Sequence, residues 1–539
     1  MRLSRLLQGL SDAEPAISAP AADPEITSIT ADSREVRPGS LFVAVPGFVS
    51  DGHAFIAKAL EAGAAAVLVQ RDHLAAGLPS SIPLPPFPGP HPNPSPTVRE
   101  GDRGKGGGAT VGDVLVAVDD TRSALSAAAT AFHGYPGRQL RVIGITGTDG
   151  KTTTSYLINA VLEGAARSTG LFGTVEYKVG PRWLSNPSRL TTPGAPEVQA
   201  LLAEMVEAGV DYAIVESTSH GLELHRLDHC DYDVGVFTNL SPDHLDLHGT
   251  VEAYRAAKGR LFDMLDLATE KHGRRYAVLN ADDPASEYMR GRTRVSTITY
   301  GVCDGATVRA TTVEARPNGT GVQVDSPAGS CTLDLQMPGL FNVSNALAAV
   351  CVGLGEGLEL GQIAAALTRF AGVPGRMERI EMGQPFTVIV DYAHTGDALR
   401  KVLKSLRPSV GGRMIVVFGS AGERGHTRRS GMGEAAAELA DYSILTDEDP
   451  RSEDPELIIE EIAAAMRSRG RSEPADFVCI LDRERAIDQA IGMAGPGDFI
   501  LLAGKGHESS IEVRGENRPW DDRAAARRAL SENGYNSQN

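Results

Sequence analysis

The chain has 539 residues, of which 42% are hydrophobic and 22% charged, and its formal net charge at pH 7 is -17. One hydrophobic core rarely supports a chain of this length, so we expect roughly two to four domains. The negative charge argues against a general nucleic-acid or membrane-surface binder, which would present a basic face, although a few local Arg or Lys side chains could still hold an anionic substrate.

Nothing in the sequence indicates export or membrane insertion. Residues 1–9 include no apolar segment long enough for a signal peptide, and no stretch of about 18 uninterrupted apolar residues occurs. The five cysteines are scattered and lack CxxC spacing, which is typical of reduced thiols. We therefore expect a cytoplasmic protein, monomeric, that acts on small molecules without a nucleic-acid or membrane partner.

The segment from about Leu78 to Gly108 is dominated by Pro, Gly, Ser and charged residues. Such a composition buries too little apolar surface to offset its ordering entropy, so we expect a disordered insertion. A proline-rich docking ligand is the alternative. Strand-like runs flank the segment at 64–69 and 113–118, so the insertion interrupts one small domain and does not separate two.

After this insertion, short β-branched runs alternate with Ala- and Leu-rich helical patterns. The alternation is typical of βαβ units around a largely parallel sheet. The expected strands are 140–145, 212–216, 234–238, 276–279, 386–391, 414–418 and 499–503. We predict an α/β protein of three domains: a small N-terminal domain (1–138), a central domain with a mainly parallel sheet (139–374) and a Rossmann-like C-terminal domain (375–539).

A glycine-rich turn lies between the first expected central strand and a helix. Its residues are Gly147, Thr148, Asp149, Gly150, Lys151, Thr152 and Thr153. Glycines let backbone N–H groups converge on phosphate oxygens, and the helix N-terminus adds positive potential. Lys151 can neutralise the β- and γ-phosphates, and the Thr152 hydroxyl can ligate Mg²⁺. We predict an ATP-binding phosphate loop; a plain βα turn is the alternative.

The sequence TGTDGKT at 146–152 resembles the TGT-(N/D)-GKT loop of the Mur ligase family, and further motifs extend this resemblance. VESTSHGL at 215–222 is similar to the family's EVSSHGL, and FTNLSPDHLDLH at 237–248 to its TNLSxDHLDxH. The resemblance implies that Glu216 joins Thr152 in binding one Mg²⁺ and that His244 holds a second.

Lys258, which follows His244 by 14 residues, matches a lysine that is carbamylated in these ligases. Carbamylation would convert a cation into a carboxylate that reaches toward magnesium. The alternative is an unmodified lysine on a solvated helix face. Lys151, Glu216, His244 and carbamylated Lys258 are the catalytic residues that the resemblance implies.

Nucleotide contacts are implied by four more motifs, VLNADD, PGLFNVSNA, PGRME and VDYAHT. The residues concerned are Asn280, Asn342, Arg376, Asp391 and His394. Arg376 is expected to neutralise phosphate between the central and C-terminal domains. Asn342 and Asn345 would share one helix face, where they either contact ATP or pin the backbone.

The N-terminal segment ITADSREVRPGSLFVA at 29–44 resembles the DSRxVxPGxLFVA opening of ligases that act on UDP-muramoyl peptides. Folylpolyglutamate synthases lack such a domain. The resemblance implies that Ser33 binds the uridine diphosphate. It assigns the muramoyl-peptide to Thr191, Thr192, Thr218 and Arg226. Leu224 is a departure, because the family often has Gln there.

Three C-terminal segments, FGSAGER, TDEDPRSEDP and AGKGHE, resemble the family's FGxxGxR, TxDNPRxEDP and AGKGHE. Together they imply the member that adds a diamino acid to UDP-N-acetylmuramoyl-L-alanyl-D-glutamate. The implied contacts to the incoming amino acid are Arg424, Glu448, Asp449, Arg451, Gly504 and Glu508.

Two features of this region favour different amino acids. Arg451 favours meso-diaminopimelate, because a guanidinium binds the distal carboxylate bidentately and lysine-adding relatives usually lack this arginine. Glu448-Asp449 replaces the family's Asp-Asn, and the added carboxylate favours a terminal ammonium. Pairing of Asp449 with Arg451 would leave a site for L-lysine or L-ornithine. We predict diaminopimelate, with lysine or ornithine as the alternative.

The predicted activity is therefore an ATP-dependent ligase of peptidoglycan precursor synthesis. The D-glutamyl carboxylate attacks the γ-phosphoryl group to form an acyl phosphate, and the amino group of the diamino acid then displaces phosphate. Domain closure would exclude water from the intermediate. The alternatives are a Mur ligase that adds D-alanyl-D-alanine and a P-loop ATPase without a nucleotide-sugar substrate.

Overall fold

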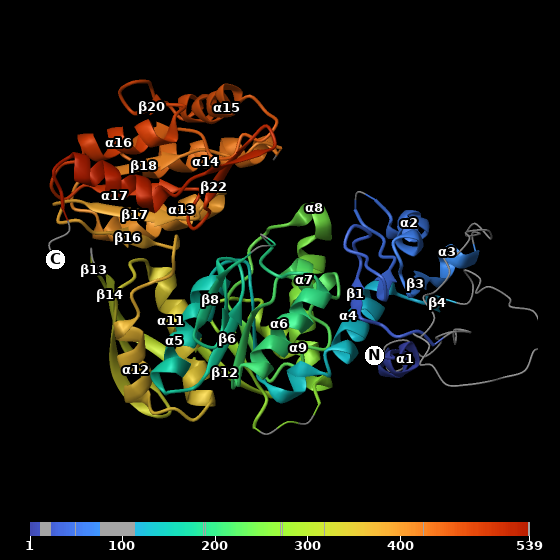
Figure 1. The fold of residues 1–539 in the computed structure, drawn as a ribbon. Helices are drawn as coiled ribbons and strands as arrows, with labels where there is room; N and C mark the ends of the chain where they lie inside the picture. The colour runs from blue at the N-terminus through green and yellow to red at the C-terminus, as the bar shows by residue number, and fades with distance from the viewer. Residues whose placement is uncertain are drawn as a thin grey trace, which may run out of the picture.

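The computed structural model describes residues 1–10, 23–48, 50–75, 114–186, 188, 190–269, 271, 273–316, 319–423 and 425–536. The insertion predicted at 78–108 and the predicted site residue Arg424 lie outside these described residues. The chain forms three α/β domains, each around its own sheet, and Figure 1 shows the C-terminal domain above the central one with the N-terminal domain beside it. This confirms the predicted three-domain class.

The N-terminal domain contains a four-stranded parallel sheet in the order β1-β2-β3-β4. Strands β3 and β4, which lie on either side of the predicted insertion, pair with each other in this sheet. The strands are β1 (Ser28–Thr30), β2 (Ser40–Val43), β3 (Ala66–Gln70) and β4 (Leu115–Val118). The helices are α1 (Leu3–Leu10), η1 (Gly52–Phe55), α2 (Ile56–Glu61), α3 (Arg71–Ala75) and α4 (Thr121–Phe132).

The central domain contains an eleven-stranded sheet in the order β15-β14-β13-β12-β11-β10-β5-β9-β6-β7-β8. The interior strands are parallel, and the pairs at both edges are antiparallel. Strand β5 lies between β9 and β10, so the carboxyl ends of these three strands meet at one edge, where ligands of open α/β sheets bind. The strands are β5 (Arg141–Thr146), β6 (Thr169–Phe172), β7 (Glu176–Val179), β8 (Arg182–Ser185), β9 (Tyr212–Glu216), β10 (Val234–Phe237), β11 (Tyr276–Asn280), β12 (Ser296–Gly301), β13 (Val308–Arg316), β14 (Gly319–Ser326) and β15 (Gly329–Leu335).

Helices cover both faces of the central sheet. One core includes Leu157 of α5, Leu347 of α11 and Ile363 of α12, and the other includes Leu202 of α6 and Phe262 of α9. Each fully buried aliphatic or aromatic side chain of this kind contributes about 1.5–3 kcal/mol. The helices are α5 (Lys151–Gly164), α6 (Ala195–Glu207), α7 (Ser219–Glu223), α8 (Leu245–His248), α9 (Val251–Leu267), α10 (Ser286–Arg290), α11 (Leu340–Gly355) and α12 (Leu360–Arg369).

The C-terminal domain contains a six-stranded sheet in the order β16-β17-β21-β18-β19-β20, parallel except for β16. A separate hairpin joins β22 to β23. The strands are β16 (Glu378–Ile380), β17 (Thr387–Asp391), β18 (Met414–Phe418), β19 (Tyr442–Leu445), β20 (Phe477–Cys479), β21 (Phe499–Ala503), β22 (Ser510–Val513) and β23 (Glu516–Pro519). The helices are α13 (Gly396–Leu406), α14 (His426–Leu439), α15 (Pro455–Ser468), α16 (Arg483–Met493) and α17 (Asp522–Glu532), with a short 3₁₀ turn at Arg407–Ser409. Another 3₁₀ turn, at Pro136–Gln139, lies outside this domain and leads into β5.

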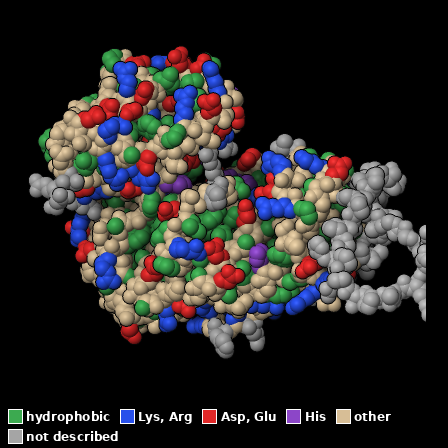
Figure 2. Space-filling model, in the orientation of Figure 1, with side chains coloured by type: hydrophobic (Ala, Val, Ile, Leu, Met, Phe, Trp, Pro, Cys, Tyr) green, Lys and Arg blue, Asp and Glu red, His purple; other side chains and the backbone are tan. Residues whose placement is uncertain are grey.

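All seven strands predicted in the central and C-terminal domains are confirmed to within one residue at each end. The predicted boundaries near 138 and 375 fall between the sheets and remain predictions. Figure 2 shows the surface hollowed between the C-terminal and N-terminal lobes, above the central domain. No helix within the described ranges has both the length and the apolar character needed to cross a bilayer.

Candidate active site

The glycine-rich turn connects the end of β5 at Thr146 to the start of α5 at Lys151. Gly147 and Gly150 have φ angles of 152° and 82°, which side-chain-bearing residues rarely adopt. A Cβ atom at Gly147 would lie 1.9 Å from Thr238 Oγ1, and one at Gly150 would lie 2.4 Å from Asn345 Oδ1. Conformation and packing therefore both require glycine, and the turn lies against the end of β10.

Lys151 folds its side chain back over this turn. Its Nζ donates hydrogen bonds of 2.9 Å to the main-chain oxygens of both Gly147 and Thr148. Burial lowers the pKa of the Lys151 ammonium, and the negative charge of Glu216 opposes that shift. A positive charge is thus held over the loop in the position from which it can reach bound phosphates.

Glu216 ends strand β9 and is fully buried beside the phosphate loop. Its Oε2 accepts hydrogen bonds from Thr152 Oγ1 at 2.9 Å and Thr174 Oγ1 at 3.0 Å, and its Oε1 accepts one from the Thr174 main-chain nitrogen at 3.1 Å. Burial raises the pKa of Glu216, and the charge of Lys151 opposes this. A carboxylate and a hydroxyl that converge in this way supply the oxygen ligands that Mg²⁺ prefers.

Lys258 lies on α9 and is buried, so the solvated face that the alternative placed it on is wrong. Its side chain is 1% exposed, its Nζ donates to the Gly147 main-chain oxygen at 2.6 Å, and it lies 4.2 Å from the centroid of the Tyr254 ring. Burial, reinforced by the charge of Lys151, holds the pKa of Lys258 well below its usual value. Loss of the proton is therefore easier at this position than for an exposed lysine.

His244 lies at the start of α8 with a positive φ of 52° and an exposed side chain. Its ring centroid is 4.7 Å from that of His220 and 6.2 Å from that of Tyr254. Burial lowers the pKa of His220 to about 4, and the charges of His244 and His248 add to the effect. The sequence assigned no role to His220 or His248. The structure brings these three histidines together, and the rings of His244 and His248 also contact Tyr254, next to Lys258 and the phosphate loop.

The predicted asparagines brace the site through the backbone. Asn280 Nδ2 donates to the Thr238 main-chain oxygen at 2.7 Å, and Asn342 Nδ2 donates to that of Pro338 at 2.7 Å. Asn345 links Asn342 Oδ1 at 3.1 Å to Thr154 Oγ1 at 3.3 Å. These contacts give α11 a fixed position against α5, so the backbone-pinning alternative has direct structural support.

Arg376, Asp391 and His394 lie where the C-terminal domain joins the central one. The Arg376 guanidinium stacks 4.3 Å from the centroid of the Tyr392 ring, and its charge opposes the upward pKa shift that burial causes in Asp391. The Arg376 charge also opposes the upward pKa shift of Glu216, so the electric field of Arg376 reaches the phosphate site. Asp391 accepts main-chain hydrogen bonds from Met377 and Ala393 at 2.8 Å.

Three threonines and an arginine predicted to contact the muramoyl-peptide form one polar cluster beside Glu216. Thr192 Oγ1 donates to the Glu216 main-chain oxygen at 2.8 Å and lies 2.9 Å from Thr218 Oγ1. Arg226 Nη1 donates to the Thr192 main-chain oxygen at 3.0 Å. Thr191 Oγ1 lies 3.0 Å from Thr174 Oγ1, whereas Ser33 lies in the N-terminal domain, in the turn after β1.

Glu448, one of the predicted amino-acid contacts, is buried, at 4% exposure. Burial raises its pKa, which the charges of Arg428 and Lys505 oppose. Its Oε2 is buried and has no hydrogen-bond partner among the described residues, and it would lie 2.9 Å from a Cβ atom at Gly504. The site thus presents an unsatisfied carboxylate oxygen.

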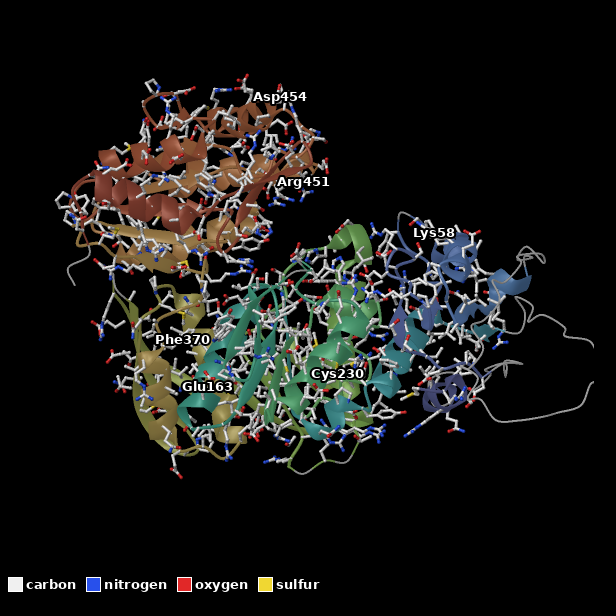
Figure 3. All side chains as sticks on the ribbon, viewed as in Figure 1. Lys58, Glu163, Cys230, Phe370, Arg451 and Asp454 are labelled. Carbon is white, nitrogen blue, oxygen red and sulfur yellow. The ribbon has the colours of Figure 1, made fainter. Side chains whose placement is uncertain are left out.

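Asp449 and Arg451 do not pair, so the pairing considered from the sequence is wrong. Asp449 Oδ2 accepts a hydrogen bond from Lys505 Nζ at 2.9 Å, and Lys505 also contacts Glu508 at 2.6 Å. Arg451 has a positive φ of 53° and lies 3.8 Å from Glu423 and 3.7 Å from Glu512. Figure 3 shows Arg451 at the edge of the C-terminal domain that faces the N-terminal domain.

Sequence reasoning missed two residues that shape the site, Thr174 and Lys505. Thr174 follows the carboxyl end of β6, the edge at which Glu216 also lies, so strand position was the available signal. Lys505 stands beside the predicted contact Gly504 in AGKGHE, but its partner Asp449 is 56 residues away in sequence. Sequence spacing alone could not indicate that pairing.

Three family models match successive parts of the chain. They are described as the Mur ligase family catalytic domain at residues 25–133, the Mur ligase middle domain at 145–353 and the Mur ligase glutamate ligase domain at 375–506. With this coverage, and with the phosphate loop and the buried Glu216 in place, the chain belongs to the Mur ligase family.

Within that family, the chain is similar to enzymes that make the UDP-muramoyl-tripeptide. It is 47% identical to a UDP-N-acetylmuramyl-tripeptide synthetase of Roseiflexus sp., covering 99% of this chain and 100% of the relative. It is 41% identical to the UDP-N-acetylmuramoyl-L-alanyl-D-glutamate–2,6-diaminopimelate ligase of Geobacillus thermodenitrificans, covering 95% and 96%. A solved structure of a ligase with that name matches with a TM-score of 0.62 and 30% identity, over 95% of this chain and 96% of that one.

Proposed function

We propose that the protein adds meso-diaminopimelate to UDP-N-acetylmuramoyl-L-alanyl-D-glutamate with consumption of ATP, as a step of peptidoglycan precursor synthesis. The observation that supports this most directly is the double role of Glu216. Its carboxylate contacts Thr152 of the phosphate loop, and its main-chain oxygen contacts Thr192 of the polar cluster. A phosphate-binding site and a site for a polar acceptor therefore share one residue, as phosphoryl transfer to a carboxylate requires.

The phosphate side must hold a triphosphate close to an acceptor carboxylate, and both are negative. Lys151 and Arg376 supply positive charge from the central and C-terminal domains. Thr152 and Glu216 would hold Mg²⁺, and the fit is good because their oxygens already converge at 2.9 Å. When bound, Mg²⁺ neutralises phosphate oxygens.

His244 and a carbamylated Lys258 would form the second magnesium site. Lys258 suits the modification because its buried amine has a pKa far below the usual value, and a neutral amine is the form that reacts with carbon dioxide. His244 suits the second magnesium site because its ring is exposed. Among the described residues, the rings that its ring contacts are those of His220 and Tyr254.

On the acceptor side, Thr191, Thr192, Thr218 and Arg226 would bind the muramoyl-peptide, and Ser33 the uridine diphosphate. Arg226 would attract an acceptor carboxylate through its positive charge, and its hydrogen bond to the Thr192 main-chain oxygen orients the guanidinium. Leu224 offers no hydrogen bond to the peptide, so this site has one polar contact fewer than is usual in the family.

For the amino acid, the structure supports diaminopimelate in two ways. The buried Arg451 Nε atom has no hydrogen-bond partner among the described residues, and a guanidinium is suited to bind a distal carboxylate bidentately. The unsatisfied Glu448 Oε2 can accept the adjacent ammonium, and Lys505 neutralises Asp449. The contacts of Arg451 with Glu423 and Glu512 keep L-lysine or L-ornithine as the alternative, because they balance its charge without a substrate carboxylate.

The test is phosphate release from ATP with Mg²⁺ and UDP-muramoyl-dipeptide, comparing meso-diaminopimelate, L-lysine and L-ornithine. We expect release with diaminopimelate and little with the others. Release with lysine or ornithine alone would refute the amino-acid assignment, and release with none of them would refute the ligase. The cytoplasmic location and the monomeric state remain predictions.

A further inference from the structure

Helix α13 of the C-terminal domain contacts the central domain through two side chains one turn apart. Lys401 Nζ lies 2.7 Å from Asp149 Oδ2 and 3.2 Å from Ser241 Oγ. Ser405 Oγ accepts a hydrogen bond of 2.7 Å from the main-chain nitrogen of Leu340, the first residue of α11. Residues four apart share one helix face, so α13 presents a docking face to the phosphate loop and to α11.

The Ser405 contact acts as a helix cap supplied by another domain. The N-cap of α11 is Gly339, which makes no side-chain capping bond. A hydroxyl that accepts from the first turn of a helix satisfies an otherwise unpaired donor. This contact is independent of the lysine contact, and it fixes α13 over the same end of the central domain.

Asp149 places a carboxylate inside the phosphate loop. Burial lowers the pKa values of Lys151 and Lys258. The negative charge of Asp149 opposes both shifts, so the electric field of this carboxylate reaches the two lysines of the site. The same field repels a triphosphate bound at this loop. The main-chain oxygen of Asp149 is held by Thr238 Oγ1 at 2.6 Å, which keeps the residue at the mouth of the loop.

We propose that Lys401 is a positioning residue that neutralises Asp149 and completes the phosphate site only when the C-terminal domain is docked; this rests on the proposed binding of ATP at the loop. With the ammonium 2.7 Å from the carboxylate, the loop no longer opposes the triphosphate. Because coupling between binding and docking is reciprocal, bound ATP favours the docked arrangement of the domains.

The test is a double-mutant cycle on the KM for ATP, with Lys401→Met, Asp149→Asn and the double variant, measured by phosphate release with the full-length enzyme. Lys401→Met should raise this KM about fivefold, the upper range for an exposed ion pair, with a smaller change in kcat. Adding Asp149→Asn should return the KM to near the wild-type value, because the charge that needs neutralising is gone. Lys401→Arg should retain the wild-type KM, and the rise in Lys401→Met should shrink at high ionic strength.

Lys404→Met is the matched control, because Lys404 is an exposed lysine on the same helix. An unchanged KM in Lys401→Met, or an equal rise in Lys401→Met and Lys401→Met/Asp149→Asn, would overturn the proposal. Binding of a fluorescent ATP analogue to each variant gives the same comparison without ligation. If the wild type binds this analogue but does not ligate, the proposed function fails. The affinities of the variants for the analogue then still decide the role of Lys401.

Discussion

Glu216→Gln is expected to stabilise the fold at neutral pH while abolishing ligation. The carboxylate is fully buried at the end of β9, and burial raises its pKa, opposed mainly by the charge of Lys151. A raised pKa in the folded state means that ionisation is less favourable there than in the unfolded chain, so the ionised carboxylate lowers stability. Glutamine has nearly the same shape and no charge to desolvate.

Changes in hydrogen bonding limit the stability that Glu216→Gln gains. Glu216 accepts from Thr152 Oγ1 at 2.9 Å, Thr174 Oγ1 at 3.0 Å and the Thr174 main-chain nitrogen at 3.1 Å. Glutamine keeps one oxygen for the main-chain donor, and its amide group can donate to the two hydroxyls after they rotate. Weakening two charge-assisted bonds costs about 1–3 kcal/mol, whereas relief of a buried charge recovers several. A net gain of about 1 kcal/mol corresponds to about 2–4 °C in Tm.

Thermal unfolding of both proteins between about pH 4 and about pH 8 measures this effect. As the pH falls through the raised pKa, wild-type Glu216 takes up a proton and its cost disappears, so the difference should be largest near neutral pH and shrink in acid. Phosphate release should fall at least about 100-fold in Glu216→Gln. Glu223→Gln, at an exposed position, is the control. A variant less stable than the wild type at every pH, or fully active, would refute the reasoning.

Three further predictions concern the lysines and the amino-acid site. Lys151→Ala should abolish phosphate release without changing the circular dichroism spectrum; wild-type rates would contradict the phosphate-loop assignment. Arg451→Ala should lower kcat/KM for meso-diaminopimelate about tenfold more than for L-lysine, because a charged hydrogen bond contributes about 1.5–3 kcal/mol, and equal losses would remove the basis for the preference. ¹³C-labelled bicarbonate should give a carbamate NMR signal in the wild type and none in Lys258→Arg; full wild-type activity without carbon dioxide would contradict the modification.

The strands and the phosphate loop were predictable because their signals are local. Buried parallel strands are continuous apolar runs, as in Ile415–Phe418, and no long-range information is needed to recognise them. The loop needs glycines at Gly147 and Gly150 for conformations that other residues rarely adopt, so its spacing is visible in the sequence. In the folded sheet β5 pairs with β9 and β10, and this pairing brings Glu216, at the end of β9, to the loop.

The charge partners could not be predicted, because packing between distant segments selects them. Asp449 and Arg451 are two residues apart, yet the main-chain nitrogen of Arg451 donates to the Glu512 main-chain oxygen and its positive φ turns the chain between them. Asp449 is consequently paired with Lys505, and Arg451 lies near Glu512 of β22. Lys401 contacts Asp149 only because α13 docks on the central domain, which no local pattern encodes.

Two lysines of this acidic chain meet at the phosphate loop, and they are suited to different roles. Lys151 and Lys258 both donate to the Gly147 main-chain oxygen, at 2.9 and 2.6 Å. Burial, reinforced by repulsion from the Lys151 ammonium that shares this acceptor, lowers the pKa of Lys258 far below its usual value. Lys258 is thus poorly suited to remain a cation. Burial favours the neutral amine, which is the form that reacts with carbon dioxide, and attraction to Lys151 would then stabilise the resulting carbamate beside the phosphate loop.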